Sequence, residues 1–128
     1  MFENEIGTSV VDCAVKIHRE TGPGLLESVY ERILAHQLRQ RGFLVETQVA
    51  IPIEYHEIKF DEGFRADLIV ENKVIVELKC VEKLHNAHKK QLLTYLRLSG
   101  MHLGFLLNFS EPLIKNGIIR TVNNLVES

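Results

Sequence analysis

The segment RADLIVENKVIVELKC, residues 65–80, consists of two apolar runs on either side of a turn. Short apolar runs rich in valine and isoleucine, separated by turn residues, predict two strands of a protein core. Asp67, Glu77 and Lys79 nevertheless place charge inside these runs. Because burying a charged group is costly unless it is paired, these three residues are the first candidates for a functional site.

The turn between the two runs decides whether the two carboxylates meet. Side chains alternate faces along a strand, so Ile75, Glu77 and Lys79 share one face of the second strand. A two-residue turn places Asp67 and Glu77 on opposite faces of the hairpin. A three-residue turn at residues 71–73, or a bulge, brings Asp67 across from Glu77. A functional site requires this second register.

Two opposed carboxylates repel each other, so a cation must relieve the repulsion or one carboxylate stays protonated. Lys79 is one candidate cation. Mg²⁺ is the other, because it takes oxygen ligands from one or two carboxylates, keeps several waters and binds substrate phosphate. A lysine beside such an ion orients a water for attack on a phosphodiester. The alternative is an exposed ion-pair cluster worth about 0–1 kcal/mol, and the spacing alone does not separate the two interpretations.

The rest of the chain predicts helices before and after this hairpin. The expected helices are Asn4–Glu20, Leu26–Arg41 and Asn86–Ser99, and the expected strands are Phe43–Ile51, Phe64–Val70, Val74–Cys80 and Leu103–Phe109. Residues 118–122 fit either an edge strand or a helical tail. The order α-α-β-β-β-α-β predicts an α/β sandwich around a central mixed sheet.

Two local predictions are more specific. The polar segment HEIKFDEG, residues 56–63, is typical of a turn or loop between strands. In the second helix, the apolar periodicity places a set of side chains toward the core. These are Leu26, Val29, Tyr30, Ile33, Leu34 and Leu38.

Composition indicates a cytoplasmic globular protein. The 128 residues are 45% hydrophobic and 25% charged, which favours a single domain over residues 1–128. No apolar tract is long enough to span a membrane. The two cysteines are too few for a disulfide scaffold. The formal charge of −2 provides no overall attraction to nucleic acid, so such a partner needs a local basic patch or a metal ion.

Three motifs resemble one known family. GLLESVY, residues 24–30, resembles the signature of the GxxExxY proteins, a family within the PD-(D/E)XK nuclease-like superfamily. RADLIVENKVIVELK looks like the central hairpin of that family. HKKQLLTYL, residues 88–96, resembles the QxxxY helix of RecB-type members. The resemblance runs from about Val11 to Leu125 and implies a restriction-endonuclease-like fold.

The resemblance also implies a role for each matching residue. It assigns the metal to the carboxylates of Asp67 and Glu77 and the carbonyl of Leu78, makes Lys79 the catalytic lysine, and adds Glu27, Gln91 and Tyr95 to the active site. The expected cofactor is Mg²⁺ or Mn²⁺. The proline in the superfamily's name is absent, because Ala66 precedes Asp67.

Structural roles are the alternatives at these positions. A carboxylate such as Glu27 near the start of a helix is favoured by the helix dipole. Tyr30 fits a core position, and Gln91 and Tyr95 fit the rim of an amphipathic helix. A zinc site at the histidines of residues 85–88 lacks suitably placed further ligands.

Three functional hypotheses follow. The first is a metal-dependent nuclease, with DNA favoured over RNA as its substrate and no membrane partner. The second is a non-catalytic module that keeps the nuclease fold and binds a nucleic acid or a protein. The third is an obligate homodimer whose interface is its main function, suggested by the apolar N-terminal helix.

Overall fold

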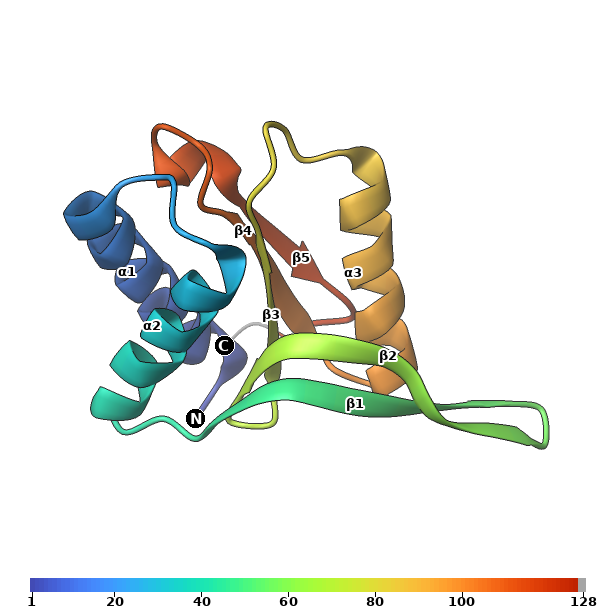
Figure 1. The fold of residues 1–128 in the computed structure, drawn as a ribbon. Helices are drawn as coiled ribbons and strands as arrows, with labels where there is room; N and C mark the ends of the chain where they lie inside the picture. The colour runs from blue at the N-terminus through green and yellow to red at the C-terminus, as the bar shows by residue number, and fades with distance from the viewer. Residues whose placement is uncertain (127–128) are drawn as a thin grey trace.

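The chain forms three layers, with a five-stranded sheet between a pair of helices and a single helix (Figure 1). The computed structural model describes residues 1–126. The helices are α1 (Glu3–Thr21), α2 (Glu27–Gln40), α3 (Asn86–Ser99) and the short 3₁₀ helix η1 (Ile114–Gly117). The strands are β1 (Val45–Tyr55), β2 (Ile58–Val70), β3 (Val74–Lys79), β4 (Leu103–Asn108) and β5 (Ile118–Val122). Within residues 1–126, no helix has the length and apolar character that a membrane span needs.

The sheet is mixed, as the sequence predicts. Its strands lie in the order β1-β2-β3-β4-β5, and only the pairing of β3 with β4 is parallel. A parallel connection needs a crossover, which α3 provides. Residues 118–122 form the edge strand β5 and not a helical tail. The architecture is that of a restriction-endonuclease-like fold.

Each face of the sheet buries its own core. Leu68, Val76 and Leu78 belong to the cluster beneath α1 and α2. Ile69 and Ile75 belong to the cluster beneath α3. Side-chain alternation places Asp67 on the same face as Ile69 and Glu77 on the same face as Ile75.

The apolar side of α1 packs inside its own chain. Ile6, Val10 and Cys13 on this helix are fully buried in the core cluster that α1 shares with α2 and the sheet. This side of α1 is not available to a second subunit. The apolar side of this helix therefore gives no support to a dimer, and the dimer itself stays a prediction.

The segment of residues 56–63 is mostly strand, which corrects the prediction of a loop. β2 begins at Ile58, and the turn is confined to residues 56–57. The pairs Tyr55↔Ile58 and Ile53↔Phe60 extend the β1–β2 ladder. The polar residues of this segment alternate with apolar ones, and a strand exposed on both faces tolerates such polarity. Polarity alone therefore gave the wrong prediction.

The start of α2 also differs from the prediction. Leu26 is the N-cap residue and is 73% exposed, and Val29 is 37% exposed. Tyr30, Leu34 and Leu38 are buried, as predicted. The helix begins one residue later than expected, and its first turn lies at the rim of the core, where Leu26 and Val29 face solvent.

Candidate active site

The turn between β2 and β3 sets the register that the site requires. Val70 pairs with Val74 across a three-residue connection. Glu71 and Asn72 both adopt left-handed backbone conformations, with φ of 54° and 55°. Glu71 is held there by Leu44, whose N–H donates to Oε2 of Glu71 at 2.7 Å and whose carbonyl accepts from the Glu71 N–H at 2.8 Å. The predicted register is confirmed, and Asp67 lies beside Glu77.

Asp67 and Glu77 lie where β2 and β3 stop pairing through their backbones. The regular ladder ends at Leu68↔Val76. Beyond it, the N–H of Asp67 donates to Oε2 of Glu77 at 2.9 Å, and the N–H of Leu78 donates to Oδ2 of Asp67 at 2.9 Å. The carboxylates thus replace the missing backbone acceptors. Because the N–H and C=O of one strand residue point to the same side, the Leu78 carbonyl also faces Asp67.

Glu77 is a buried carboxyl group in an unfavourable electrostatic environment. Its exposure is 6%. Burial, followed by the negative charge of Asp67, raises the pKa of Glu77 from its ordinary value of 4.5 to about 8. The N–H of Asp67 and the charge of Lys79 act in the opposite direction but do not offset the burial. A cation at this point would favour the ionised form of Glu77.

Lys79 ends β3 on the same face as Glu77. The described residues contain no ion pair between Lys79 and a carboxylate. The strand end itself is held by Asn108, a fully buried residue at the end of the neighbouring strand β4. Oδ1 of Asn108 accepts from the N–H of Val81, and its Nδ2 donates to the carbonyl of Val81. These bonds fix the chain just after Lys79.

Glu27 is brought to this strand end by the loop before α2. Burial, and then the charge of Asp67, raises the pKa of Glu27, while the charge of Lys79 and the backbone N–H of Cys80, the residue after β3, lower it. Glu27 therefore lies within electrostatic reach of both Asp67 and Lys79.

Tyr30 shapes the loop that carries Glu27. Its hydroxyl donates to the carbonyl of Gly22 at 2.5 Å and accepts from the N–H of Leu25 at 3.2 Å. Its ring is fully buried and stacks on Phe109 at a centroid distance of 4.3 Å. Gly24 lies between the two bonded residues with φ of 117°, a conformation that favours glycine. Tyr30 is thus a core residue, and it holds the loop closed.

The helix α3 contributes Tyr95 to the neighbourhood of the carboxylates. Its ring stacks on Phe64 at 3.9 Å with an interplanar angle of 5°. Burial, followed by the charges of Glu77 and Asp67, raises the pKa of Tyr95. Gln91 lies one turn earlier and is exposed. Among the described residues, no hydrogen bond joins the Gln91 side chain to the carboxylates. The structure therefore groups Tyr95 with the carboxylates and leaves Gln91 at the rim.

The comparison with known families agrees with this geometry. The family model of the PD-(D/E)XK nuclease superfamily matches residues 4–121. The chain belongs to this superfamily. No curated protein and no solved structure matches the chain.

Two further residues of this PD-(D/E)XK protein, Gln48 and Glu31, reach the site and are not among the residues predicted from the sequence. Gln48 donates from Nε2 to Oε1 of Glu31 at 2.5 Å and to Oδ1 of Asp67 at 3.3 Å. Burial raises the pKa of Glu31, the Gln48 bond lowers it, and the charges of Asp67 and Glu27 raise it further. The four-residue spacing from Glu27 signals Glu31, because it places both on one side of α2. Gln48 has a φ of 51° within β1, which no local pattern predicts.

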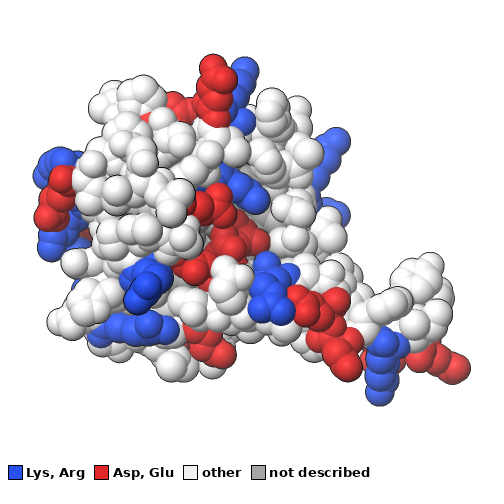
Figure 2. Space-filling view, in the orientation of Figure 1, with Lys and Arg blue, Asp and Glu red and all other residues white. Residues whose placement is uncertain are grey.

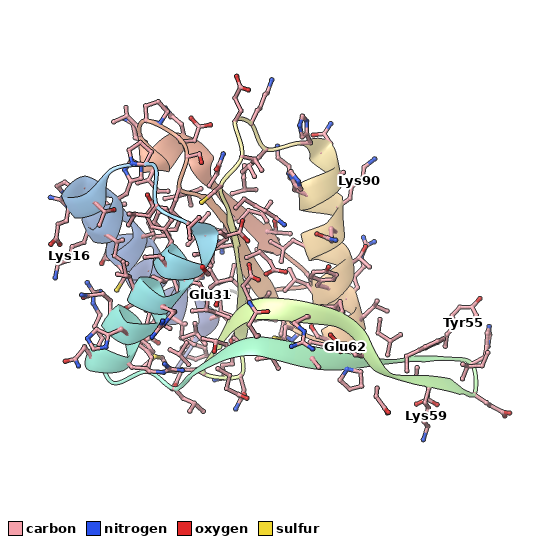
Figure 3. All side chains as sticks on the ribbon, viewed as in Figure 1. Lys16, Glu31, Tyr55, Lys59, Glu62 and Lys90 are labelled. Atoms are coloured by element: carbon pink, nitrogen blue, oxygen red, sulfur yellow. The ribbon has the colours of Figure 1, made fainter. Side chains whose placement is uncertain are left out.

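The acidic residues of this PD-(D/E)XK protein gather at the centre of one face, between α2 and the sheet (Figure 2). Figure 3 shows Glu31 in this region. Within residues 1–126, no three His, Cys, Asp or Glu side chains are grouped closely enough to hold a metal by themselves. The sequence predicts no zinc site at His85 and His88. In the structure, the backbone N–H of His85 donates a hydrogen bond to Nδ1 of His88. Any metal would therefore need backbone, water or substrate ligands.

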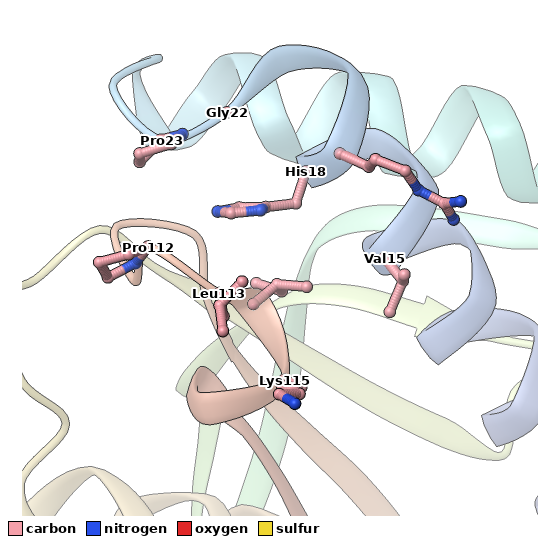
Figure 4. Close-up of a pocket in the computed structure, with 9 residues that line it drawn as sticks. Val15, His18, Gly22, Pro23, Pro112, Leu113 and Lys115 are labelled. Carbon is pink, nitrogen blue, oxygen red and sulfur yellow. The ribbon is translucent and has the colours of Figure 1, made fainter.

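A separate apolar hollow of about 450 Å³ lies at the C-terminal end of α1 (Figure 4). Its wall includes His18, Pro23 and Leu113. Nε2 of His18 bonds to the carbonyl of Glu111 at 2.8 Å, which gives this histidine a structural role. None of the residues predicted for the nuclease site lines this hollow. The carboxylates of that site lie elsewhere, where the β2–β3 pairing ends.

Proposed function

We propose that this protein is a divalent-metal-dependent nuclease that hydrolyses phosphodiester bonds, with DNA favoured over RNA. The observation that carries the proposal is the pair of hydrogen bonds that hold Asp67 and Glu77 together where the β2–β3 pairing ends, with Lys79 two residues further on the same face as Glu77. The superfamily match makes phosphodiester cleavage the natural chemistry of such an arrangement. The whole chain, residues 1–128, would act as one nuclease-like domain.

The residues present fit a hard cation such as Mg²⁺ or Mn²⁺. Asp67 and Glu77 offer carboxylate oxygens, and the Leu78 carbonyl faces the same side. Mg²⁺ and Mn²⁺ prefer oxygen ligands and complete their shells with water and phosphate. Burial first, and neighbouring carboxylates second, raise the pKa values of Glu77, Glu27 and Glu31, and a divalent cation would favour their ionised forms. A bound ion would polarise the scissile phosphate and acidify a water.

The side chains around the ligands have distinct tasks in this proposal. Lys79 orients the attacking water through its ammonium group and stabilises the negative charge that develops on the phosphate. Glu27 faces the ligands from α2, beside Cys80 at the end of β3. Tyr95, held flat against Phe64, forms the α3 wall of the site, and Gln91 extends that wall toward the substrate.

The loop before α2 supports a finer assignment to the GxxExxY family. Gly24 adopts the left-handed conformation that the loop needs, and Tyr30 closes the loop with its two hydrogen bonds. Glu27, between them, reaches the strand end that carries Lys79. Each of the three signature residues thus has a physical task in positioning the site.

A cleavage assay tests this function. End-labelled single- and double-stranded DNA and RNA are incubated with the purified protein in Mg²⁺, in Mn²⁺ or in chelator. The proposal predicts cutting of at least one DNA substrate with metal and none with chelator. Saturable binding of nucleic acid without any cleavage across the panel would contradict a nuclease and favour a binding module.

A further inference from the structure

The β1–β2 hairpin extends past the body of the protein (Figure 1). We call residues 52–63 of this hairpin the arm. The pairs Tyr55↔Ile58 and Ile53↔Phe60 lie on either side of the pair Glu54↔Lys59, and because side chains alternate faces along a strand, these two apolar pairs share one face. Tyr55 is 65% exposed, Ile58 59% and Phe60 51%. These side chains form a contiguous apolar surface, which in soluble proteins marks an interaction site more often than scattered apolar residues do.

The arm carries the wrong charge for nucleic acid. It contains four carboxylates and one lysine, a formal charge of −3. A phosphate backbone repels such a surface, because nucleic-acid binding rests on basic contacts that release counterions. The arm therefore fits a protein partner whose surface is basic and partly apolar.

Simple strand addition to the edge of β1 is also disfavoured. β1 is an edge strand of the sheet. Its backbone is irregular at Gln48, where φ is 51°, and at the register shift between Ile51 and Ile53. Pro52, within that shift, has no N–H to donate. Such features protect an edge from pairing with another strand, so a partner of the arm meets its apolar face.

The outward side of α3 has the complementary properties. The residues Lys90, Thr94, Arg97 and Leu98 are exposed along this helix, and we call them the α3 stripe. The helix contains three basic residues and no acidic ones, a formal charge of +3. Lys90 points away from the sheet in Figure 3. At about 100° per residue, Lys90 and Arg97 lie roughly 100–120° around the helix from Gln91, so they face away from the nuclease site.

Apolar surface at one end of the α3 stripe meets the base of the arm. Leu98 is 47% exposed and lines a corner of about 430 Å³ together with Ile53 and Phe60. The arm continues from this corner toward its tip, where Tyr55 lies clear of the rest of the chain (Figure 3). The tip therefore has an apolar surface that its own chain does not cover, next to a corner that admits apolar side chains.

We propose that the arm docks on the α3 stripe of a second copy of this chain, and that two copies exchange arms in a two-fold symmetric dimer. The opposite charges of the arm and α3 select this partner, because the same chain carries both surfaces. Reciprocal exchange uses each surface once per chain and closes the assembly, as isologous dimers do. Tyr55 and Ile58 contact Leu98 of the other copy, and the arm carboxylates meet Lys90 and Arg97.

Sedimentation of the full chain over a range of concentrations tests the dimer. The proposal predicts a concentration-dependent equilibrium between monomer and dimer. Replacing Tyr55→Ser and Ile58→Ser together removes the apolar contact and raises the dimer Kd by about tenfold or more. A wild-type chain that remains monomeric at about 100 µM overturns the proposal, because interfaces of standard size associate well below that concentration. A nucleic acid or an unrelated protein would then have to cover the arm.

Charge reversal separates arm exchange from any other dimer. The arm variant carries Glu57→Lys and Asp61→Lys, and the stripe variant carries Lys90→Glu and Arg97→Glu. Each variant alone faces like charges in both contacts, so its dimer Kd rises. Mixed together, the variants form a heterodimer in which both arm–stripe contacts join opposite charges. Restored association in the mixture supports exchange and shows that both variants fold, whereas association that is unchanged in each variant, or absent in the mixture, overturns it.

Discussion

The backbone N–H of Asp67 donates a 2.9 Å hydrogen bond to Oε2 of Glu77. The relationship is nearly reciprocal, because Oδ2 of Asp67 accepts from the N–H of Leu78, the residue after Glu77. Each carboxylate thus takes a place in the sheet that a backbone carbonyl would otherwise fill. The two acidic groups are held in position by the fold itself, and the proposed site is largely preformed.

The stability of the metal-free protein is predicted to fall as pH rises. The folded state raises the pKa of Glu77 to about 8, so it holds the proton more tightly than the unfolded chain, whose value is near 4.5. The resulting stabilisation is complete below the unfolded pKa and is lost as pH rises through the folded one. Urea unfolding of wild type and Glu77→Gln in chelator, at several pH values, measures how the free energy of unfolding depends on pH. The variant should lack this component, and identical pH profiles would contradict the assignment.

Lys79→Ala is predicted to remove cleavage while leaving metal binding intact. The ammonium group stabilises charge at the phosphate, and its loss should slow single-turnover cleavage by about 100-fold or more. The lysine is not a ligand, so Mn²⁺ should bind the variant as it binds wild type. Lys83→Ala, an exposed lysine four residues later, is the matched control. A variant that cuts as fast as wild type would exclude Lys79 from the chemistry.

Gln48 is predicted to position Asp67 for the metal. Gln48→Gly keeps the left-handed backbone without strain, so stability should change by no more than about 1 kcal/mol. The lost bonds to Glu31 and Asp67 should weaken Mn²⁺ binding by about 10-fold, as loss of groups that orient ligands does. Mn²⁺ titration and urea unfolding of the same preparation separate the two effects. An unchanged Mn²⁺ affinity would show that Gln48 has only a structural role.

Tyr30→Phe is predicted to loosen the loop before α2. The ring keeps its stacking on Phe109, but the bonds to Gly22 and Leu25 are lost. Two lost hydrogen bonds should lower the free energy of unfolding by about 1–3 kcal/mol. Tyr55→Phe, which removes an exposed hydroxyl, should cost almost nothing. Equal stability of the two variants would contradict the role given to Tyr30.

Much of the fold is predictable from the sequence because the apolar periodicities are strong where the core is deep. α3 begins and ends at the predicted residues, and the three-residue turn gives the expected pairing of Val70 with Val74. The prediction fails where side chains are exposed. In the arm, Ile58 and Phe60 pair across strands without being buried, so polarity suggested a loop. At the start of α2, the periodicity does not reveal that Leu26 lies beyond the rim of the core.

Some residues of the candidate site are predictable from the sequence and others are not. Asp67, Glu77 and Lys79 are visible in the sequence because charge stands out within apolar strands. Glu31 has a sequence signal, because its spacing from Glu27 places it on the same side of α2. Gln48 could not be found, because its contact with Asp67 depends on an irregular backbone conformation within β1.

Equilibrium binding of Mn²⁺ to the purified full chain tests the central claim most directly, because it asks whether Asp67 and Glu77 hold a metal. Wild type and Glu77→Gln are compared, with Glu82→Gln as a control at an exposed carboxylate beyond β3. The account predicts that wild type and the control bind one ion alike, and that Glu77→Gln binds it at least about 10-fold more weakly. Equal Mn²⁺ affinity in Glu77→Gln and wild type, or no binding by wild type, would contradict the account.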